Sequence, residues 1–174
     1  MKIALYSLLA LFALVALILI GARFGLFAGH PPTDLGITDG RLKPPSPTRN
    51  SVSSQAMLHP GHPQRDYAQI APLRFIGGDP TASLEALKAK LSAMPEITLI
   101  EQHPDYLRAE AHTRWLRFVD DLEFWVNPQA GVIEIRSASR LGSEDFGVNR
   151  ERMERIRAGY LGREGGITHR SVER

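Results

Sequence analysis

The fold is decided by residues 113–157, TRWLRFVDDLEFWVNPQAGVIEIRSASRLGSEDFGVNRERMERIR, where a strand hairpin, an arginine-rich turn and an amphipathic helix follow one another. Successive side chains of a strand point to opposite faces, so a half-buried strand alternates apolar and polar residues. One face of the first strand carries Phe118, Leu122, Phe124 and Val126, and the other carries Val119, Asp121, Glu123 and Trp125. After the turn at 127–131, Ile133 and Ile135 alternate with Glu134 and Arg136. The hairpin therefore predicts a sheet with one apolar face, which needs a cover, and one charged face exposed to water.

The residues on either side of the hairpin predict an α+β fold. Residues 73–76, 97–101 and 106–113 have the pattern of short strands. Asp79-Pro80 predicts a helix start, because Asp accepts bonds from free amides and Pro needs no partner there. The apolar stripes of the two helices are Leu84, Leu87, Leu91 and Met94, and then Val148, Met153, Ile156 and Tyr160. We expect an antiparallel sheet of about five strands with two helices packed on one face, a two-layer sandwich.

A run of twenty residues, 3–22, contains no charged side chain and predicts a transmembrane helix. At a rise of about 1.5 Å per residue it crosses the roughly 30 Å hydrocarbon layer. A cleavable signal peptide is the alternative, but residues 21–23 and 27–29 fit the small-residue cleavage site poorly. Lys2 precedes the run and Arg23 follows it, which favours a cytoplasmic N-terminus. We expect a single-pass anchor in the bacterial cytoplasmic (inner) membrane, with the C-terminal domain on the periplasmic or extracytoplasmic side.

Composition divides the chain into four segments. They are a transmembrane anchor at 1–23, a Pro-rich linker at 24–72, a globular α+β domain at 73–162 and a flexible tail at 163–174. Eight of the twelve prolines fall in the linker, which has no hydrophobic periodicity. A domain of about ninety residues can bury one modest core.

Composition also excludes several classes of function. The chain has no cysteine, which excludes disulfides, thiolate metal sites and thiol catalysis. Its net charge of +2 comes from Lys2 and Arg23, since the other basic and acidic residues balance. A nucleic-acid binder would show a basic surplus, so we expect no nucleic-acid partner. No catalytic triad, phosphate loop or strong metal motif is present, and we expect neither a cofactor nor a metal site.

Three motifs resemble those of a known family. They are RFVDD at 117–121, IRSASR at 135–140 and GSEDFGVNR at 142–150. In this order they are similar to the signature of domain of unknown function 1499, over roughly residues 47–161. The resemblance implies a small domain found in membrane-attached or exported bacterial proteins and in plastids, without an established activity. An upstream Asn-Cys-Val-Ser-Ser cluster is also typical of the family, and here Ser51 takes the place of its cysteine.

The arginine-rich turn is the first candidate site. A helix N-terminus offers free amides, so together with guanidinium groups it can hold a phosphate or carboxylate. The candidate ligand-binding residues are Arg136, Ser137, Ser139, Arg140, Asp145, Asn149 and Arg150. The alternative is internal bracing, with Arg140 paired to Asp145, Arg136 paired to Asp121, and Asn149 as a helix cap.

A polar cluster is the second candidate. Alternation places His112, Asp121 and Glu123 on the charged face, where carboxylates and an imidazole suit a divalent cation. The same residues are also ordinary for a sheet face in water. Asp120 falls on the apolar face, so it must be paired, for example by Arg140, or must have a raised pKa.

Two functions follow from these candidates. The first is a membrane-anchored envelope protein whose extracytoplasmic domain binds an envelope protein or a small anionic ligand without catalysis. The second is a metal-dependent hydrolase that uses the cluster of Asp120, Asp121, Glu123 and His112. We favour the first, because no activated nucleophile and base can be named in the sequence.

Overall fold

The elements of the chain follow one another in an order close to the predicted one. The structure, a computed structural model, describes residues 2–162, and the tail expected at 163–174 lies outside the described residues. In chain order it contains α1 (Lys2–Arg23), β1 (Ser51–Ser53), η1 (Ala56–Leu58), α2 (Arg65–Ala68), β2 (Leu73–Arg74), η2 (Ile76–Gly78), α3 (Pro80–Ser92), β3 (Ile97–Gln102), β4 (Tyr106–His112), β5 (Val119–Asn127), β6 (Val132–Ser139) and α4 (Val148–Leu161). The predicted succession from β2 to α4 is confirmed.

The strands form one six-stranded antiparallel sheet in the order β1-β6-β5-β4-β3, and β2 also pairs with β6. β3 to β6 are neighbours both in sequence and in space, as expected of a meander. The sequence did not predict β1, which adds Ser51 opposite Ala138 and Ser53 opposite Arg136. The part of the sheet that β1 forms beside β6 is therefore built from residues upstream of the predicted domain.

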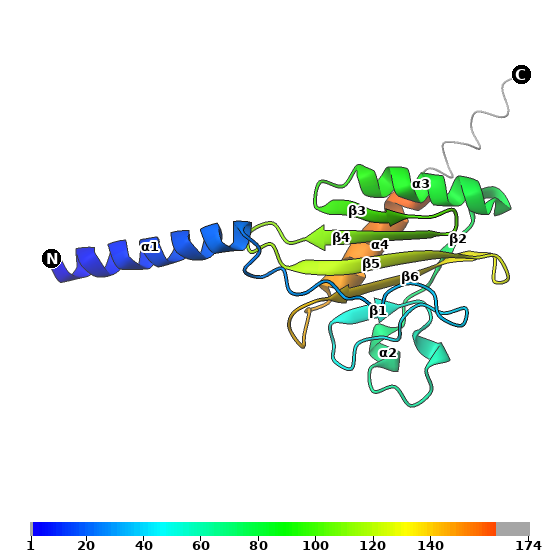
Figure 1. Cartoon of the computed structure of the whole chain (residues 1–174), viewed down its shortest axis with the longest axis horizontal. Coiled ribbons are helices and arrows are strands. Elements are labelled where there is room, and N and C mark those ends of the chain that lie inside the picture. Colours follow the sequence, from blue (N-terminus) through cyan, green and yellow to red (C-terminus); the bar gives the residue numbers. More distant parts are fainter. Residues whose placement is uncertain (1, 163–174) are drawn as a thin grey trace, which may run out of the picture.

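Two helices cover one face of this sheet. Figure 1 shows α4 behind the strands and α3 alongside β3. Apolar residues of both helices form one core with the facing residues of the sheet. The helical residues are Leu84, Leu87, Leu91, Met153, Ile156 and Tyr160, and Met94 joins them just after α3. The predicted α+β architecture is confirmed. Val148 differs from the prediction, because as the first residue of α4 it lies at the rim of this layer and is exposed.

Local sequence signals set the start of α3 and the turn between β5 and β6. The carboxylate of Asp79 accepts hydrogen bonds from the amides of Thr81 (2.8 Å) and Ala82 (3.1 Å). Pro80 occupies the first helical position, where an amide hydrogen would have no helical partner. In the hairpin turn Gly131 has a φ of 67°, a conformation that residues with a side chain rarely adopt. The predicted helix start and hairpin are both present.

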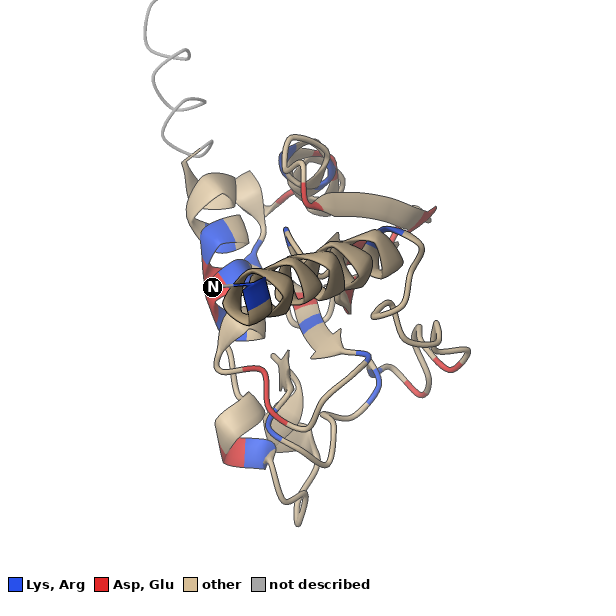
Figure 2. Ribbon diagram, turned by 90° about the vertical axis from the view of Figure 1, so that its left-hand side faces the viewer, with Lys and Arg blue, Asp and Glu red and all other residues tan. Residues whose placement is uncertain are grey.

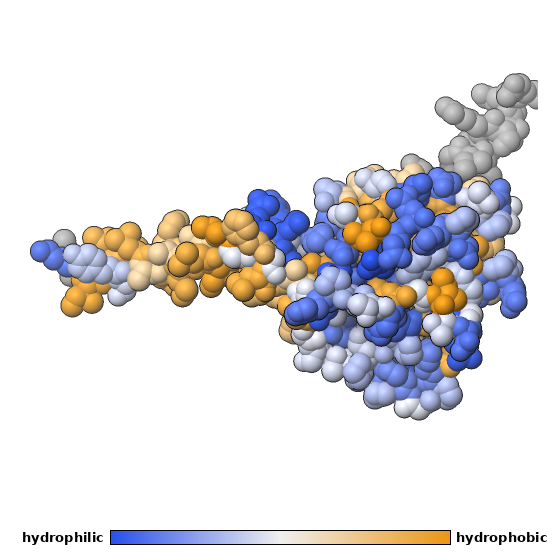
Figure 3. Space-filling model, in the orientation of Figure 1, coloured by the Kyte–Doolittle hydropathy of each residue, from blue (hydrophilic) through white to orange (hydrophobic). Residues whose placement is uncertain are grey.

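The first helix is an apolar rod that projects from the domain. Its mean hydropathy reaches 2.9 over an 18-residue window, so it is long and apolar enough to cross a membrane. A membrane anchor and a signal sequence both have these properties. Figure 3 shows a hydrophobic surface along most of α1 and a largely hydrophilic surface on the visible face of the domain.

The end of α1 is held against the domain. Ala22 is buried, and the rings of Phe27 and Phe118 lie 5.3 Å apart between centroids. Gly29 approaches Arg140 so closely that a Cβ atom at this glycine would lie 2.8 Å from the Cβ of Arg140. The chain therefore passes from the helix directly onto the domain.

The charged face of the sheet is covered, whereas the sequence predicted a face exposed to water. Residues 30–47 cross it, mostly outside helices and strands, and are drawn in blue shades in Figure 1. Gly36 donates its amide to Glu123 (2.8 Å), and Arg136 donates to the carbonyl oxygen of Pro44 (3.4 Å). The expected linker contacts buried charges through its own backbone groups, which leave no hydrophobic pattern in the sequence.

Candidate functional site

A buried ion pair joins the sheet to α4. β5 places Asp120 on the face that α4 covers, where an unpaired carboxylate would be costly. The Nη2 atom of Arg152 lies 2.6 Å from Oδ2 of Asp120, and the two side chains are only 4% and 6% exposed. Asp120 therefore has an arginine partner, but it is Arg152 rather than Arg140, because Arg140 bonds to Asp121 on the opposite face.

Asn149 connects the arginine-rich turn to residues upstream of the sheet. Its side-chain amide donates to the carbonyl oxygen of Asn50 (3.1 Å) and to Oγ of Ser139 (2.9 Å). It also donates to Oδ2 of Asp145 (2.8 Å), and its oxygen accepts a bond from the hydroxyl of Ser137. Because Asn149 is fully buried, these bonds satisfy groups that would otherwise be costly to bury.

Asp145 caps α4 and does not pair with Arg140. Its carboxylate accepts hydrogen bonds from the amides of Gly147 (3.0 Å) and Asn149 (3.1 Å) and from the hydroxyl of Tyr67 (2.8 Å). Burial opposes ionisation of Asp145, but these hydrogen bonds outweigh it and hold its pKa below the ordinary value. The predicted helix cap is thus supplied by Asp145 instead of Asn149.

On the opposite face, Arg136 of β6 pairs with Glu123 of β5. The Nη1 atom of Arg136 lies 3.0 Å from Oε2 of Glu123, and the glutamate side chain is fully buried. Tyr106 donates its hydroxyl to Oε1 of the same carboxylate (2.9 Å). Burial, followed by the charge of Glu123, raises the pKa of Tyr106. The pair predicted between Arg136 and Asp121 is wrong, because Glu123 lies directly opposite Arg136 in the strand register.

Arg140 holds two carboxylates that come from two different strands. Its Nε and Nη2 atoms lie 2.8 and 2.7 Å from the two carboxylate oxygens of Asp121, and Nη2 also bonds to Glu110. The hydrogen bond with Asp121 is the largest cause that holds the pKa of Arg140 above its ordinary value. Bidentate arginine–carboxylate contacts of this kind fix geometry as well as charge.

His112 lies at the end of β4 beside these charges. Its Nε2 atom is 3.9 Å from Oε2 of Glu110. Burial lowers the pKa of His112, and the positive charge of Arg117 lowers it further. The imidazole is therefore held in its neutral form at neutral pH.

The remaining predicted residue, Arg150, also bonds within the domain. Its guanidinium donates to the carbonyl oxygens of Gln69 (2.8 Å) and Tyr67. All of the predicted ligand residues thus form hydrogen bonds or ion pairs with other residues of the chain, namely Arg136, Ser137, Ser139, Arg140, Asp145, Asn149 and Arg150. These contacts brace the turn and occupy the donors that a ligand would need.

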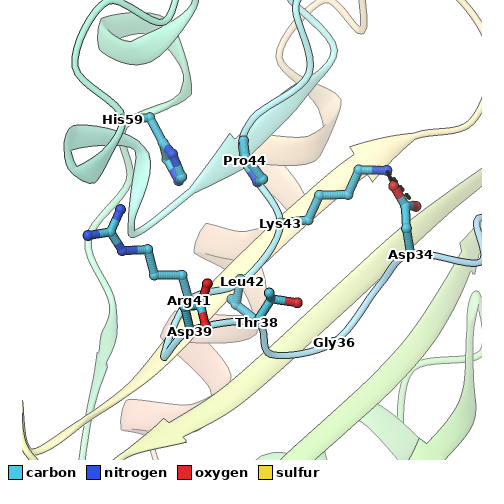
Figure 4. Close-up of a pocket in the computed structure, with 9 residues that line it drawn as sticks. All are labelled: Asp34, Gly36, Thr38, Asp39, Arg41, Leu42, Lys43, Pro44 and His59. Atoms are coloured by element: carbon cyan, nitrogen blue, oxygen red, sulfur yellow. Dashed lines mark hydrogen bonds and ion pairs between the residues drawn. The ribbon is translucent and has the colours of Figure 1, made fainter.

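A polar pocket of about 620 Å³ lies over the covered face, and Figure 4 shows its lining. Its charges are mixed: Nζ of Lys43 is 2.6 Å from the carboxylate of Asp34, and Arg41 donates to the carbonyl oxygen of Leu58 (3.3 Å). Burial lowers the pKa of His59, and nearby Arg41 lowers it further. Because Lys43 is paired with Asp34 and the lining also contains both Asp39 and Arg41, this pocket favours neither an anion nor a cation.

A second pocket, of about 640 Å³, is strongly cationic. It lies between the loop 113–118, the start of β3 and the first half of α4. Its lining residues are Pro95, Glu96, His112, Thr113, Arg114, Arg117, Val148, Arg152 and Arg155. Figure 2, which looks along α1 onto this end of the domain, shows several basic positions on α4, the helix that precedes the grey trace.

The arginines of this pocket differ in their partners. Arg152 pairs with Asp120 as described, and Nη1 of Arg155 lies 3.6 Å from Oε1 of Glu96. Within residues 2–162, no carboxylate oxygen lies within 4.0 Å of the guanidinium nitrogens of Arg114 or Arg117. Two cations without carboxylate partners therefore face a pocket that an anion can enter.

The polar cluster does not assemble as a metal centre. Asp120 lies on the face that α4 covers, whereas Asp121 and Glu123 point to the other face and bond to Arg140 and Arg136. Among the described residues, no group of three or more His, Cys, Asp or Glu side chains is arranged to hold a metal ion.

A family model described as "Protein of unknown function (DUF1499)" matches residues 41–159. The chain belongs to the DUF1499 family. No curated protein and no solved structure matches the chain. The resemblance inferred from the three motifs is thereby confirmed, and the matched range begins upstream of the predicted domain, within the segment that covers the charged face.

Within the DUF1499 match, sequence reasoning missed Arg152, which pairs with Asp120, and two arginines in the loop between β4 and β5. Arg114 and Arg117 are not among the predicted site residues, although Arg117 begins the family motif RFVDD. A usable signal was present: two arginines flank Trp115 in a turn that contains no acidic residue. Such a turn leaves its cations without local partners.

Proposed function

We propose that the chain is a membrane-anchored envelope protein whose domain binds a small anionic ligand, without catalysis, in the cationic pocket. The observation that carries the proposal is the pair Arg114 and Arg117, which face the pocket without a carboxylate partner. Arg155 and the neutral His112 add hydrogen-bond donors around the same space. Phosphate and carboxylate groups match guanidinium donors in both geometry and charge.

The proposed location is the bacterial inner membrane, with α1 uncleaved and the domain on the periplasmic or extracytoplasmic side. Phe27 and Gly29 support an uncleaved helix, because their close contacts with Phe118 and Arg140 tie the residues that follow α1 to the domain. Fusions of alkaline phosphatase and of a fluorescent protein after Leu161 test the orientation. Active phosphatase and a dark fluorescent fusion are expected, and the reverse pattern would refute the orientation.

Phosphate binding to the full-length protein in neutral detergent tests the pocket. Inorganic phosphate should raise the pKa of His112, since a bound anion offsets the effects of burial and of Arg117. The pKa is read from isotope-labelled histidine by nuclear magnetic resonance with and without phosphate. Arg117→Gln should weaken phosphate binding by at least about tenfold, the effect of losing one charge-assisted hydrogen bond.

Arg74→Gln is the matched control, because Arg74 is an exposed arginine of β2 that does not line the pocket. It should bind phosphate as the unmodified protein does. The proposal fails when phosphate leaves the pKa of His112 unchanged, or when Arg117→Gln and Arg74→Gln have equal affinities.

A further inference from the structure

Large apolar side chains are exposed at the end of the domain from which α1 leaves. Trp115, in the loop between β4 and β5, is 67% exposed, and Phe146, in the loop between β6 and α4, is 91% exposed. Leu141 and Val148 are exposed beside them. A cavity of about 280 Å³ connects the two loops, because Thr113, Phe118, Leu141, Phe146 and Val148 are among its lining residues. Exposed apolar groups that gather at one end mark an interaction surface.

This surface is continuous with the membrane-spanning candidate. Phe118, which lines the cavity between the loops, contacts the ring of Phe27 just after α1. Phe24 and Leu26, in the turn that ends the helix, are exposed as well. Figure 1 shows the loop between β4 and β5 and the loop before α4 at the end of the domain nearest α1. If α1 spans a bilayer, these two loops lie nearer to the bilayer than the strands of the sheet do.

Basic side chains accompany the apolar ones. Arg114 and Arg117 flank Trp115 in the sequence, and the guanidinium of Arg114 lies over the Trp115 ring, 5.1 Å from its centroid. Arg23 ends α1 at the same end of the domain. Tryptophan is enriched at membrane interfaces, and arginine binds the phosphates of anionic lipids. Glu144, in the loop of Phe146, pairs with Arg49 at 3.3 Å. The arginines without carboxylate partners therefore give this surface a charge that complements an anionic bilayer.

We propose that this end of the domain docks on the bilayer that contains α1. Trp115 and Phe146 enter the interfacial region, and Arg114 and Arg117 contact the phosphates of anionic lipids. The contact of Phe27 with Phe118 and the close approach of Gly29 to the domain orient this surface toward the membrane. Docking goes beyond the proposed binding of a free anion, because it depends on Phe146, which does not line the cationic pocket.

Quenching of tryptophan fluorescence by brominated lipids tests the docking. The full-length protein is reconstituted in vesicles of phosphatidylcholine, with or without phosphatidylglycerol, that contain lipids brominated on the acyl chains. The chain has two tryptophans, so Trp125→Phe reports on Trp115 and Trp115→Phe reports on Trp125. Trp125 lies toward the other end of β5, about 20 Å along the strand from Val119. Trp115 should be quenched, more strongly with phosphatidylglycerol, and Trp125 should not.

Two further variants identify the groups involved. Arg114→Gln combined with Arg117→Gln should abolish the effect of phosphatidylglycerol on the quenching of Trp115. Phe146→Ser should reduce that quenching while leaving phosphate binding intact, which separates a failure of docking from a failure of the pocket. The proposal would be overturned if Trp115 were not quenched in vesicles of either composition. It would also be overturned if the quenching were the same with and without phosphatidylglycerol and were unchanged by replacing both arginines.

Spin labels provide a measurement that does not depend on replacing tryptophan. The chain has no cysteine, so Ser143→Cys and Gln129→Cys each introduce one labelling site at an exposed position. Ser143 is in the loop before α4, and Gln129 is in the turn between β5 and β6. Oxygen is concentrated in the bilayer, whereas a nickel chelate stays in water. In vesicles with phosphatidylglycerol, the spin label at Ser143 should collide more often with oxygen than with the chelate, and the label at Gln129 should not. Equal accessibility at both positions would overturn the docking.

Discussion

Asp120→Asn is expected to lower the free energy of unfolding by about 3–5 kcal/mol, the usual cost of breaking a buried pair on one side only. The reason is the guanidinium of Arg152, which is 4% exposed and would lose the carboxylate 2.6 Å away. The loss is a large part of the stability of a small domain. Urea unfolding of the full-length protein in neutral detergent, followed by tryptophan fluorescence, measures it.

A double-mutant cycle with Arg152→Met tests whether the two residues act as a pair. Replacing both should cost less than the sum of the single changes, because neither charge is then left buried alone. Glu154→Gln on the same helix is the control, since Glu154 pairs with Arg157 while half exposed, and its loss should cost less than about 1 kcal/mol. An Asp120→Asn protein as stable as the unmodified protein would show that Asp120 is kept for function instead.

Arg140→Met is expected to destabilise the domain by a similar amount, about 3–5 kcal/mol at pH 7, and to do so in a pH-dependent way. It leaves the buried carboxylate of Asp121 and the half-buried carboxylate of Glu110 without their shared cation. Protonation removes such an uncompensated charge. As the pH is lowered, the folded variant therefore takes up protons at a higher pH than its unfolded chain does. The difference in free energy of unfolding between the variant and the unmodified protein should shrink as the pH falls from 7 toward about 4.

Unfolding of Arg140→Met and of the unmodified protein is compared at several pH values. Arg49→Met is the matched control, because Arg49 pairs with Glu144 at 3.3 Å with a largely exposed side chain. Its effect should stay below about 1 kcal/mol at every pH. If Arg140→Met lowers the free energy of unfolding by the same amount at every pH, the loss does not come from unpaired carboxylates.

The sequence predicted those features that depend on neighbours along the chain. Alternation of apolar and polar residues defines β5 and β6, and Asp79-Pro80 defines the start of α3 through bonds to adjacent amides. The 20 uncharged residues before Arg23 define an apolar helix by composition alone. The family motifs could also be read directly from the chain. Alternation along the strand shows which face of the sheet a residue occupies. It placed Asp120 on the apolar face and so predicted that this carboxylate is paired.

Tertiary structure decided which partners meet. Whether Asp120 pairs with Arg152 or Arg140 depends on where α4 crosses the sheet, and no local pattern encodes that crossing. Residues 30–47 cover the charged face through backbone bonds, which any sequence can form and which therefore leave no periodic signal. Arg114 and Arg117 likewise became candidates only once the structure showed which arginines have carboxylate partners, such as Arg136, Arg140 and Arg152. The sequence by itself determined the strands β2 to β6, the helices α3 and α4 and the apolar helix α1, and three-dimensional packing determined β1 and which charges have a partner of opposite sign.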